Sequence, residues 1–299
     1  MTRIVPRERL VEYAFRIGWA TARHSPEPVA ERLLESAADR VWRSRGSGVR
    51  QLELNLARAA PERDLDELRA LSQRAMQSYF RYWHEALRLP SWSASRIVDG
   101  VVTTGEEALR ASFATGTGAV VALPHLANWD LAGAWACLTG MPVTTVAERL
   151  RPESLFERFV GYRTGLGMEV LPLDGPSGAL SGLRASLRAG RLVCLVADRD
   201  LTGGGMEVTL LGEPARLPGG PAVLARLSGA PLYAAALRYR GPLMSIDFSP
   251  EIVSRPGRDG IRAMTQEVAE WFSRGIAAAP EDWHMLQPVF SRDLGGTGA

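Results

Sequence analysis

Residues 119–130 read Ala119-Val120-Val121-Ala122-Leu123-Pro124-His125-Leu126-Ala127-Asn128-Trp129-Asp130. The uninterrupted apolar run at 119–123 predicts a buried strand, which Pro124 ends. Asn128 is a residue type that caps helices, so a helix is expected to begin directly after it. His125 is therefore expected just beyond the carboxyl end of a strand, where open α/β sheets bind their ligands.

Short apolar runs alternate with helical stretches on both sides of this segment. Strands are predicted at 97–102, 119–123, 143–147, 169–173, 192–197, 208–211, 232–237 and 244–248. Helices are predicted at 106–114, 129–138, 152–165, 178–189, 221–228 and 261–279. This alternation predicts an α/β fold with a mostly parallel central sheet and helices on both faces.

The first 95 residues have helical periodicity instead. Ser25 and Pro26 are a cap and a first-turn proline, and a second long helix is expected over 64–89. The amphipathic segment 4–22 predicts either a helix packed on the core or an in-plane membrane contact. We therefore expect a helical N-terminal region over 1–95, packed on the core, and one continuous α/β core over 96–299.

Composition excludes several classes of protein. Hydrophobic residues make up 46% of the 299 residues, and the formal net charge is only +2. This is ordinary globular usage and gives no reason to expect nucleic acid as a partner. All 35 cationic residues are arginine. Without lysine, the chain cannot be a P-loop NTPase or an enzyme that forms a Schiff base with pyridoxal phosphate.

The cysteines and the apolar segments indicate the cellular compartment. Cys137 and Cys194 lie in apolar stretches and are expected to be buried thiols in a reducing cytoplasm. Arg16 interrupts the best candidate for a signal peptide, and no window reaches the roughly 20 uncharged apolar residues of a spanning helix. No spacing of His and Cys resembles a zinc site, so no metal is expected. The prediction is a soluble protein or one that lies on a membrane surface.

His125 is the strongest catalytic candidate among the four histidines. His24 and His84 lie among charged residues on predicted helices and are expected to be surface or packing residues. Asp130 follows His125 by five residues, so a tight turn would let its carboxylate orient the imidazole and stabilise the imidazolium. The alternative is a loop histidine followed by an aspartate that interacts with the helix dipole.

The sequence offers no protein nucleophile to go with this base. A Gly-x-Ser-x-Gly elbow is absent, which argues against a serine esterase or thioesterase. The simplest scheme is that His125 deprotonates a substrate hydroxyl directly.

His125-x4-Asp130 after an apolar strand resembles the HX4D motif of the lysophospholipid acyltransferase superfamily. The stretch from Leu123 to Asp130, followed by 145–155, is similar to the lipid A late-acyltransferase branch of that superfamily. Within this branch the chain looks like the actinobacterial acyltransferases that act on phosphatidylinositol mannosides. Further matching stretches are 79–90, 162–167 and 282–288, so the resemblance covers most of the chain.

The resemblance implies direct transfer of a long-chain acyl group from acyl-CoA, with no bound cofactor, to a mannose hydroxyl of a phosphatidylinositol mannoside. His125 would be the general base and Asp130 its orienting residue. Residues implied in substrate binding are Glu148, Arg149, Arg163, Asp198, Arg199, Asp200, Trp283 and His284. For Glu148 and the arginines, the alternative is a solvated surface charge.

Two questions about these implied roles stay open at the level of sequence. The family often has glutamate where this chain has Asp198, which leaves either Asp198 or Asp200 to support His125. For Trp283 and His284, the alternative is a packed aromatic pair near the C-terminus. The sequence also does not decide the oligomeric state.

A lipid acceptor implies a peripheral protein at the cytoplasmic face of the cell membrane, with arginines of the helical region near anionic headgroups. Two alternatives remain at this point. One is the same chemistry on another glycolipid or a glycerolipid, and the other is a lipid-binding protein without catalytic activity.

Overall fold

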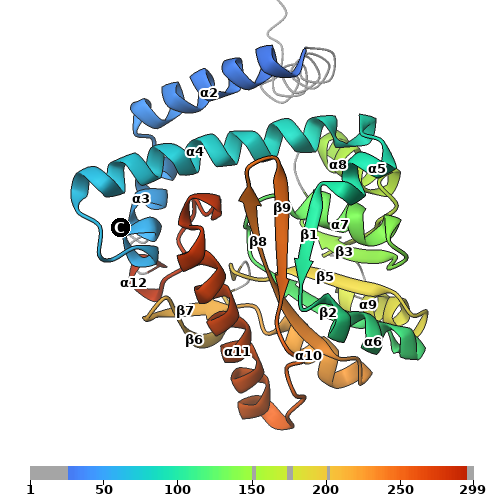
Figure 1. The fold of residues 1–299 in the computed structure, drawn as a ribbon. Coiled ribbons are helices and arrows are strands. Elements are labelled where there is room, and N and C mark those ends of the chain that lie inside the picture. Colours follow the sequence, from blue (N-terminus) through green and yellow to red (C-terminus); the bar gives the residue numbers. More distant parts are fainter. Residues whose placement is uncertain (1–25, 150–152, 174–177, 201–202, 295–299) are drawn as a thin grey trace, which may run out of the picture.

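Seven strands form one sheet, in the order β1-β9-β8-β2-β5-β3-β4, in the computed structural model (Figure 1), which describes residues 26–149, 153–173, 178–200 and 203–294. The strands are β1 (Val101–Thr104), β2 (Ala119–Leu123), β3 (Val143–Ala147), β4 (Glu169–Pro172), β5 (Leu192–Val196), β8 (Leu232–Arg240) and β9 (Leu243–Phe248). Every neighbouring pair is parallel except β8 and β9. The predicted α/β fold with a mostly parallel sheet is confirmed.

Helices cover both faces of this sheet. They are α5 (Ala94–Asp99), α6 (Glu106–Ser112), α7 (Trp129–Leu138), α8 (Glu153–Gly165), α9 (Gly178–Arg188), α10 (Gly220–Ser228) and α11 (Gly257–Ala278). The short α12 (Ser291–Leu294) lies near α3, away from these faces (Figure 1). Ala235 and Leu237 of β8 face a cavity beneath α7. Ala236, which lies between them, points the opposite way and is so close to Gly275 of α11 that a Cβ there would lie 2.4 Å from the Ala236 Cβ.

Two predicted strands differ from the structure. Residues 97–102 were expected to be a strand, but Ser93 accepts a hydrogen bond from the Arg96 amide and caps helix α5, so the strand begins only at Val101. The predicted strand at 208–211 does not join the main sheet. It is β6 (Met206–Leu210), which pairs with β7 (Glu213–Leu217) in a separate antiparallel hairpin. Leu211 and Gly212 both have positive φ, as a two-residue hairpin turn requires.

The described part of the N-terminal region, residues 26–95, is mainly helical, as predicted. It contains α2 (Glu27–Ser44), α3 (Ser47–Ala59) and α4 (Leu65–Arg88), and α4 crosses above the strands with α2 lying over it (Figure 1). Asp64 begins α4 with a reciprocal capping box to Glu67. The predicted amphipathic segment 4–22 lies outside the described residues. Within the described part of the chain, no helix combines the length and apolarity needed to span a bilayer.

Candidate active site

The parallel pairing of β2 and β5 brings two distant loops together. Leu123 at the end of β2 is in register with Val196 at the end of β5, and the Ala197 amide donates to the Leu123 carbonyl over 2.8 Å. The carboxyl ends of parallel strands lie at the same edge of a sheet. His125 and Asp198, two residues beyond these ends, therefore face each other across that edge.

His125 and Asp198 form a hydrogen-bonded dyad. Nδ1 of His125 lies 2.6 Å from Oδ1 of Asp198, and the His125 amide donates to Oδ2 over 2.9 Å. Burial alone would raise the pKa of the fully buried Asp198 carboxyl, but the nearby His125 and the hydrogen bonds that the carboxylate accepts outweigh burial and lower it. An ionised carboxylate only accepts, so Nδ1 carries the proton and Nε2 of the neutral ring is free to act as a base. This dyad answers the open question in favour of Asp198.

Trp283 provides a further hydrogen-bond donor to the Asp198 carboxylate. Its indole Nε1–H donates to Oδ2 of Asp198 over 2.9 Å, and the residue is 0% exposed. A fully buried ring that donates to a protein carboxylate is not available to a sugar. The implied role of Trp283 in substrate binding is therefore wrong.

Asp130 does not contact His125 in the structure. Its carboxylate accepts a hydrogen bond from Arg163 Nε over 2.7 Å and one from the Tyr82 hydroxyl over 3.1 Å. Asp130 lies inside the first turn of α7 and Arg163 in the last turn of α8, so this buried pair joins two helices. The nearby Asp130 raises the pKa of Arg163 against the effect of burial. The prediction that Asp130 orients His125 is therefore wrong. The Arg163 guanidinium is paired with Asp130 inside the protein.

The turn between His125 and α7 is held from several directions. Ala127 has a φ of 47°, a strained value for a residue with a side chain. Asn128 caps α7 by accepting from the Leu131 amide, and its amide group donates to Glu85 of α4 over 3.0 Å. The Tyr239 hydroxyl of β8 donates to the same Glu85 oxygen. These contacts place the start of α7 beside His125.

Ser78, Asp282 and His284 have the residue types of a hydrolase triad, but the order of contacts differs. The Ser78 hydroxyl donates to Asp282 over 2.7 Å and lies 3.0 Å from Nε2 of His284. The serine therefore lies between the acid and the histidine, whereas in a triad the histidine lies between the other two. Burial lowers the pKa of His284 to about 3, and protonation of the nearby His125 acts in the same direction, so His284 is neutral at physiological pH. The implied binding role of His284 is also wrong, because its side chain is buried.

The remaining predicted residues follow the same edge of the sheet. Glu148 and Arg149 come after β3 and are exposed, and Arg149 forms an ion pair with Glu153 over 3.2 Å. Arg199 follows Asp198 and is half-buried. Asp200 accepts from the Gly205 amide over 2.7 Å and so shapes its own loop instead of supporting His125. Across the described residues, no three His, Cys, Asp or Glu side chains are grouped to hold a metal ion.

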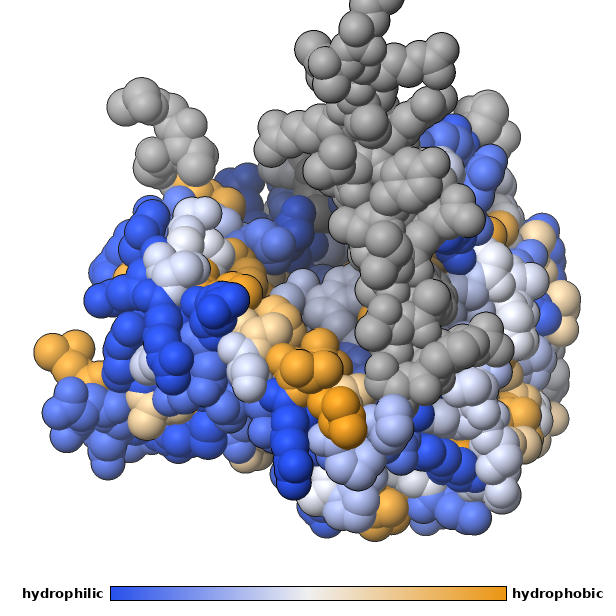
Figure 2. Space-filling model, turned by 90° about the horizontal axis from the view of Figure 1, so that it is seen from above, coloured by the Kyte–Doolittle hydropathy of each residue, from blue (hydrophilic) through white to orange (hydrophobic). Residues whose placement is uncertain are grey.

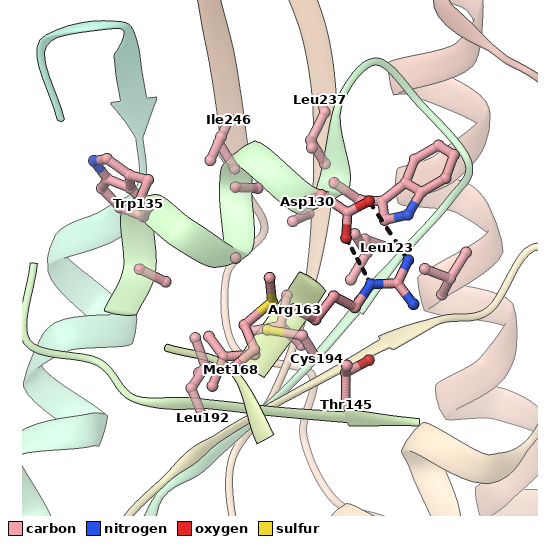
Figure 3. Close-up of a pocket in the computed structure, with 18 of the residues that line it drawn as sticks. Leu123, Asp130, Trp135, Thr145, Arg163, Met168, Leu192, Cys194, Leu237 and Ile246 are labelled. Carbon is pink, nitrogen blue, oxygen red and sulfur yellow. Dashed lines mark hydrogen bonds and ion pairs between the residues drawn. The ribbon is translucent and has the colours of Figure 1, made fainter. Parts of the chain in front are cut away.

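An apolar cavity of about 90 Å³ lies between α7 and the sheet, next to the dyad. Its walls come from α7 and from five strands, and include Leu123, Val143, Cys194, Leu237 and Ile246. Figure 3 shows Asp130 and Arg163 pointing toward each other on one side of this cavity, with Trp135 on the other side. The ion pair is thus a charged group at the border of an otherwise mostly apolar space.

Several residues of the site were not predicted as site residues from the sequence. Trp129 packs edge-on against His125 with ring centroids 5.2 Å apart, and it stacks on Tyr82 at 4.2 Å. Glu85 and Ser78 reach the site from α4, far from it in sequence. In the sequence, Trp129 and Glu85 were signalled only by lying in stretches 123–130 and 79–90 of the family resemblance, and Ser78 lies just outside the second stretch.

Comparison with known proteins identifies the family of this chain. The family model of the bacterial lipid A biosynthesis acyltransferases matches residues 2–292. A protein of Mycolicibacterium smegmatis named phosphatidylinositol mannoside acyltransferase is 39% identical over 287 residues, covering 96% of this chain and 93% of its own. A Mycobacterium tuberculosis protein of the same name is 42% identical over 290 residues, covering 95% of this chain and 89% of its own. The chain therefore belongs to the bacterial lipid A biosynthesis acyltransferase family and is an acyltransferase.

Proposed function

We propose that this acyltransferase moves a long-chain acyl group from acyl-CoA to a mannose hydroxyl of a phosphatidylinositol mannoside, with His125 as the general base. The observation that carries the proposal is the His125–Asp198 dyad, which lies at the sheet edge beside an apolar cavity. The acceptor is inferred from the names of the mycobacterial relatives.

The chemistry follows from the tautomer of His125. Nδ1–H is held by Asp198, so Nε2 accepts the proton of the acceptor hydroxyl as its oxygen attacks the thioester carbonyl. The tetrahedral intermediate collapses with cleavage of the C–S bond, and the imidazolium returns the proton to the leaving thiolate. The products are the ester and free CoA, and no acyl-enzyme forms. Asp198 stabilises the imidazolium throughout and does not take a proton.

The start of α7 provides a place for the oxyanion. The Leu131 amide is bonded to the Asn128 side chain, whereas Trp129 and Asp130 contribute first-turn amides that have no intrahelical acceptor. These N–H groups and the positive end of the helix dipole favour negative charge close to His125.

The cavity beneath α7 supplies a site for the acyl chain. Its largely apolar walls would take part of the chain out of water, which stabilises binding by about 0.8 kcal/mol for each methylene. The thioester would then lie at the end nearest the dyad. The polar groups along the sheet edge, Glu148, Arg149 and Arg199, are the proposed contacts for mannose hydroxyls and for phosphates of CoA or the acceptor.

Helix α2 offers a face for peripheral contact with the membrane surface. Val29 and Leu33 are 50% and 61% exposed, and steps of three or four residues place them on one side with the exposed Arg32, Arg40 and Arg43. Figure 2 shows hydrophobic and hydrophilic side chains side by side in the view from above, the side of the molecule on which α2 lies. Apolar and basic side chains on one helix face suit an anionic bilayer, and we place this bilayer at the cytoplasmic face of the cell membrane.

A transfer assay read by mass spectrometry tests the reaction. Purified enzyme is supplied with palmitoyl-CoA and, in separate reactions, phosphatidylinositol mannosides, lysophospholipids or water alone. His125→Ala is run beside the wild type. We expect acyl gain on the mannoside, and a loss of at least a thousandfold in kcat in the variant with its fold retained.

Each other result changes a stated part of the proposal. Acylation only of a lysophospholipid keeps the mechanism and overturns the acceptor. Release of CoA without an acylated acceptor indicates a thioesterase. Near-normal turnover of His125→Ala rejects the base, and a folded wild type without turnover leaves a lipid-binding protein.

A further inference from the structure

A segment near the C-terminus is laid directly along the turn that carries His125. We call residues 282–284 the strap. The Ala127 amide donates to the carbonyl of Asp282 over 2.9 Å, and the His284 amide donates to the carbonyl of His125 over 2.8 Å. The strap therefore holds both ends of the turn through backbone hydrogen bonds.

The strap is itself anchored to the helical region. Asp282 accepts hydrogen bonds from the Ser78 hydroxyl of α4 and from the Tyr239 amide of β8, each 2.7 Å long. Beyond the strap, the Asn55 amide group of α3 donates to the carbonyls of Met285 and Gln287. Asn55 is 0% exposed, so these bonds do not compete with water.

Between the two backbone contacts, Trp283 turns its ring inward to Asp198. The indole N–H and the His125 amide donate to the same oxygen, Oδ2, and the other oxygen faces the imidazole. Phe290 packs edge-on against the indole, with ring centroids 6.4 Å apart. The two donors to Oδ2 thus fix the rotation of the carboxylate. Its other oxygen, Oδ1, is thereby directed at Nδ1 of His125.

We propose that Trp283 is a positioning residue of the acyl transfer: its indole N–H fixes the Asp198 carboxylate so that His125 is held in one tautomer and one orientation. This inference rests on the proposed role of His125 as the base. Trp283 acts only through Asp198, since its buried ring does not reach substrate. Without that N–H, Oδ2 keeps one donor, and the carboxylate still pairs with the imidazole but no longer holds it in a single orientation.

Replacing Trp283 with Phe removes the N–H and keeps an aromatic ring. We expect kcat to fall by about 10- to 100-fold with KM unchanged, because Trp283 does not contact substrate, whereas a poorly held carboxylate misorients the base in the transition state. The Asp198 carboxylate would be less stabilised by its remaining donors, and it would in turn stabilise the imidazolium more strongly. Both changes move the acid limb of the kcat–pH profile to higher pH, by about half a unit to one unit.

Trp271→Phe is the matched control. Its indole N–H donates to the backbone carbonyl of Asp247 over 3.1 Å, between α11 and β9, and it contacts no residue of the dyad. Both variants lose one indole hydrogen bond, so a general loss of stability appears in both. Only Trp283→Phe should move the pH profile.

A measurement on the wild-type enzyme keeps the proposal testable if Trp283→Phe does not fold. The eight tryptophans are labelled with ¹⁵N in the indole ring, and their N–H resonances are followed with pH. One resonance should shift with the same midpoint as the acid limb of kcat/KM, which reports the free enzyme, and that shift should disappear in His125→Ala.

The catalytic role of His125 and the positioning role of Trp283 can be rejected separately. Activity that persists in His125→Ala overturns the proposed base, and the positioning role with it. Activity that needs His125 but is unaffected by Trp283→Phe, with the pH profile of the control, overturns the positioning role alone. So does the absence of any indole resonance that follows the acid limb.

Discussion

The Asp198 carboxylate lies 2.6 Å from Nδ1 of His125, although 73 residues separate the two in sequence. The nearer acid, Asp130, bonds to Arg163 instead. A short spacing along the chain therefore did not identify the partner of the catalytic base, because Asp130 lies inside α7 and faces a neighbouring helix.

Asp198→Asn should abolish most of the activity. A carboxamide can donate to Nδ1, which would leave the proton on Nε2 and remove the base, so we expect kcat to fall by about three to four orders of magnitude. Asp200→Asn is the matched change two residues away, at a side chain that bonds the Gly205 amide, and should lower kcat by less than about threefold. Steady-state kinetics on both variants decide between them, and equal losses would contradict the dyad.

Asp130→Asn should destabilise the fold more than it disturbs the chemistry. It leaves the buried Arg163 charge without its partner, which costs about 3–5 kcal/mol in the free energy of unfolding and lowers Tm by roughly 10 °C. Thermal unfolding measures this directly.

The double variant Asp130→Asn/Arg163→Met separates an ion-pair role from a catalytic one. Removing both charges should restore most of the lost stability, since the amide still accepts from Tyr82. We expect the double variant to keep at least about a tenth of wild-type kcat. A loss as deep as that of Asp198→Asn would return Asp130 to the catalytic machinery.

Filling the cavity should shorten the acyl chain that the enzyme accepts. Cys194 lines the cavity, and a Phe ring there would displace about two methylenes of a bound chain, which costs about 1.6 kcal/mol or roughly tenfold in binding. Palmitoyl-CoA should therefore lose about tenfold in kcat/KM relative to a donor two to four carbons shorter. Leu138→Phe, at a 46% exposed position of α7, is the control and should leave the ratio unchanged. An unchanged ratio in Cys194→Phe would place the acyl chain elsewhere.

His284 should make the fold less stable as the solution becomes acidic. Its pKa is about 3 in the folded state because of burial, against 6.5 when unfolded. The unfolded state therefore binds the proton first, so the stability present above pH 6.5 is lost as pH falls below it. Between pH 7.5 and pH 5 the loss from this group is about 2 kcal/mol.

His284→Gln removes that titration and keeps a side chain that can bond Ser78. Urea unfolding at both pH values should show the wild type losing about 2 kcal/mol more than the variant. Asp282, whose pKa burial raises to about 6, acts in the opposite direction and is present in both proteins. Parallel losses in the two proteins would mean that His284 is accessible to protons in the folded state.

Much of this protein is determined by local patterns in its sequence. The apolar run before Pro124, the Asn128 cap and the alternation of strands with helices were sufficient for the α/β fold, the start of α7 and the position of His125 at a strand end. These features depend on neighbours within a few residues, and the forces that produce them act over the same range. The helix at 94–99 was missed because Ser93, its cap, precedes an apolar stretch that equally suits a strand.

The partners of the catalytic histidine were decided only by the tertiary structure. Asp198 reaches His125 because β5 is the neighbour of β2 in the sheet, and strand order is set by the packing of the whole chain. Trp283 reaches Asp198 because the helical region holds the end of the chain against the catalytic turn. Contacts over such separations leave no periodicity in the sequence, so the sequence located the base and the fold selected the acid that orients it.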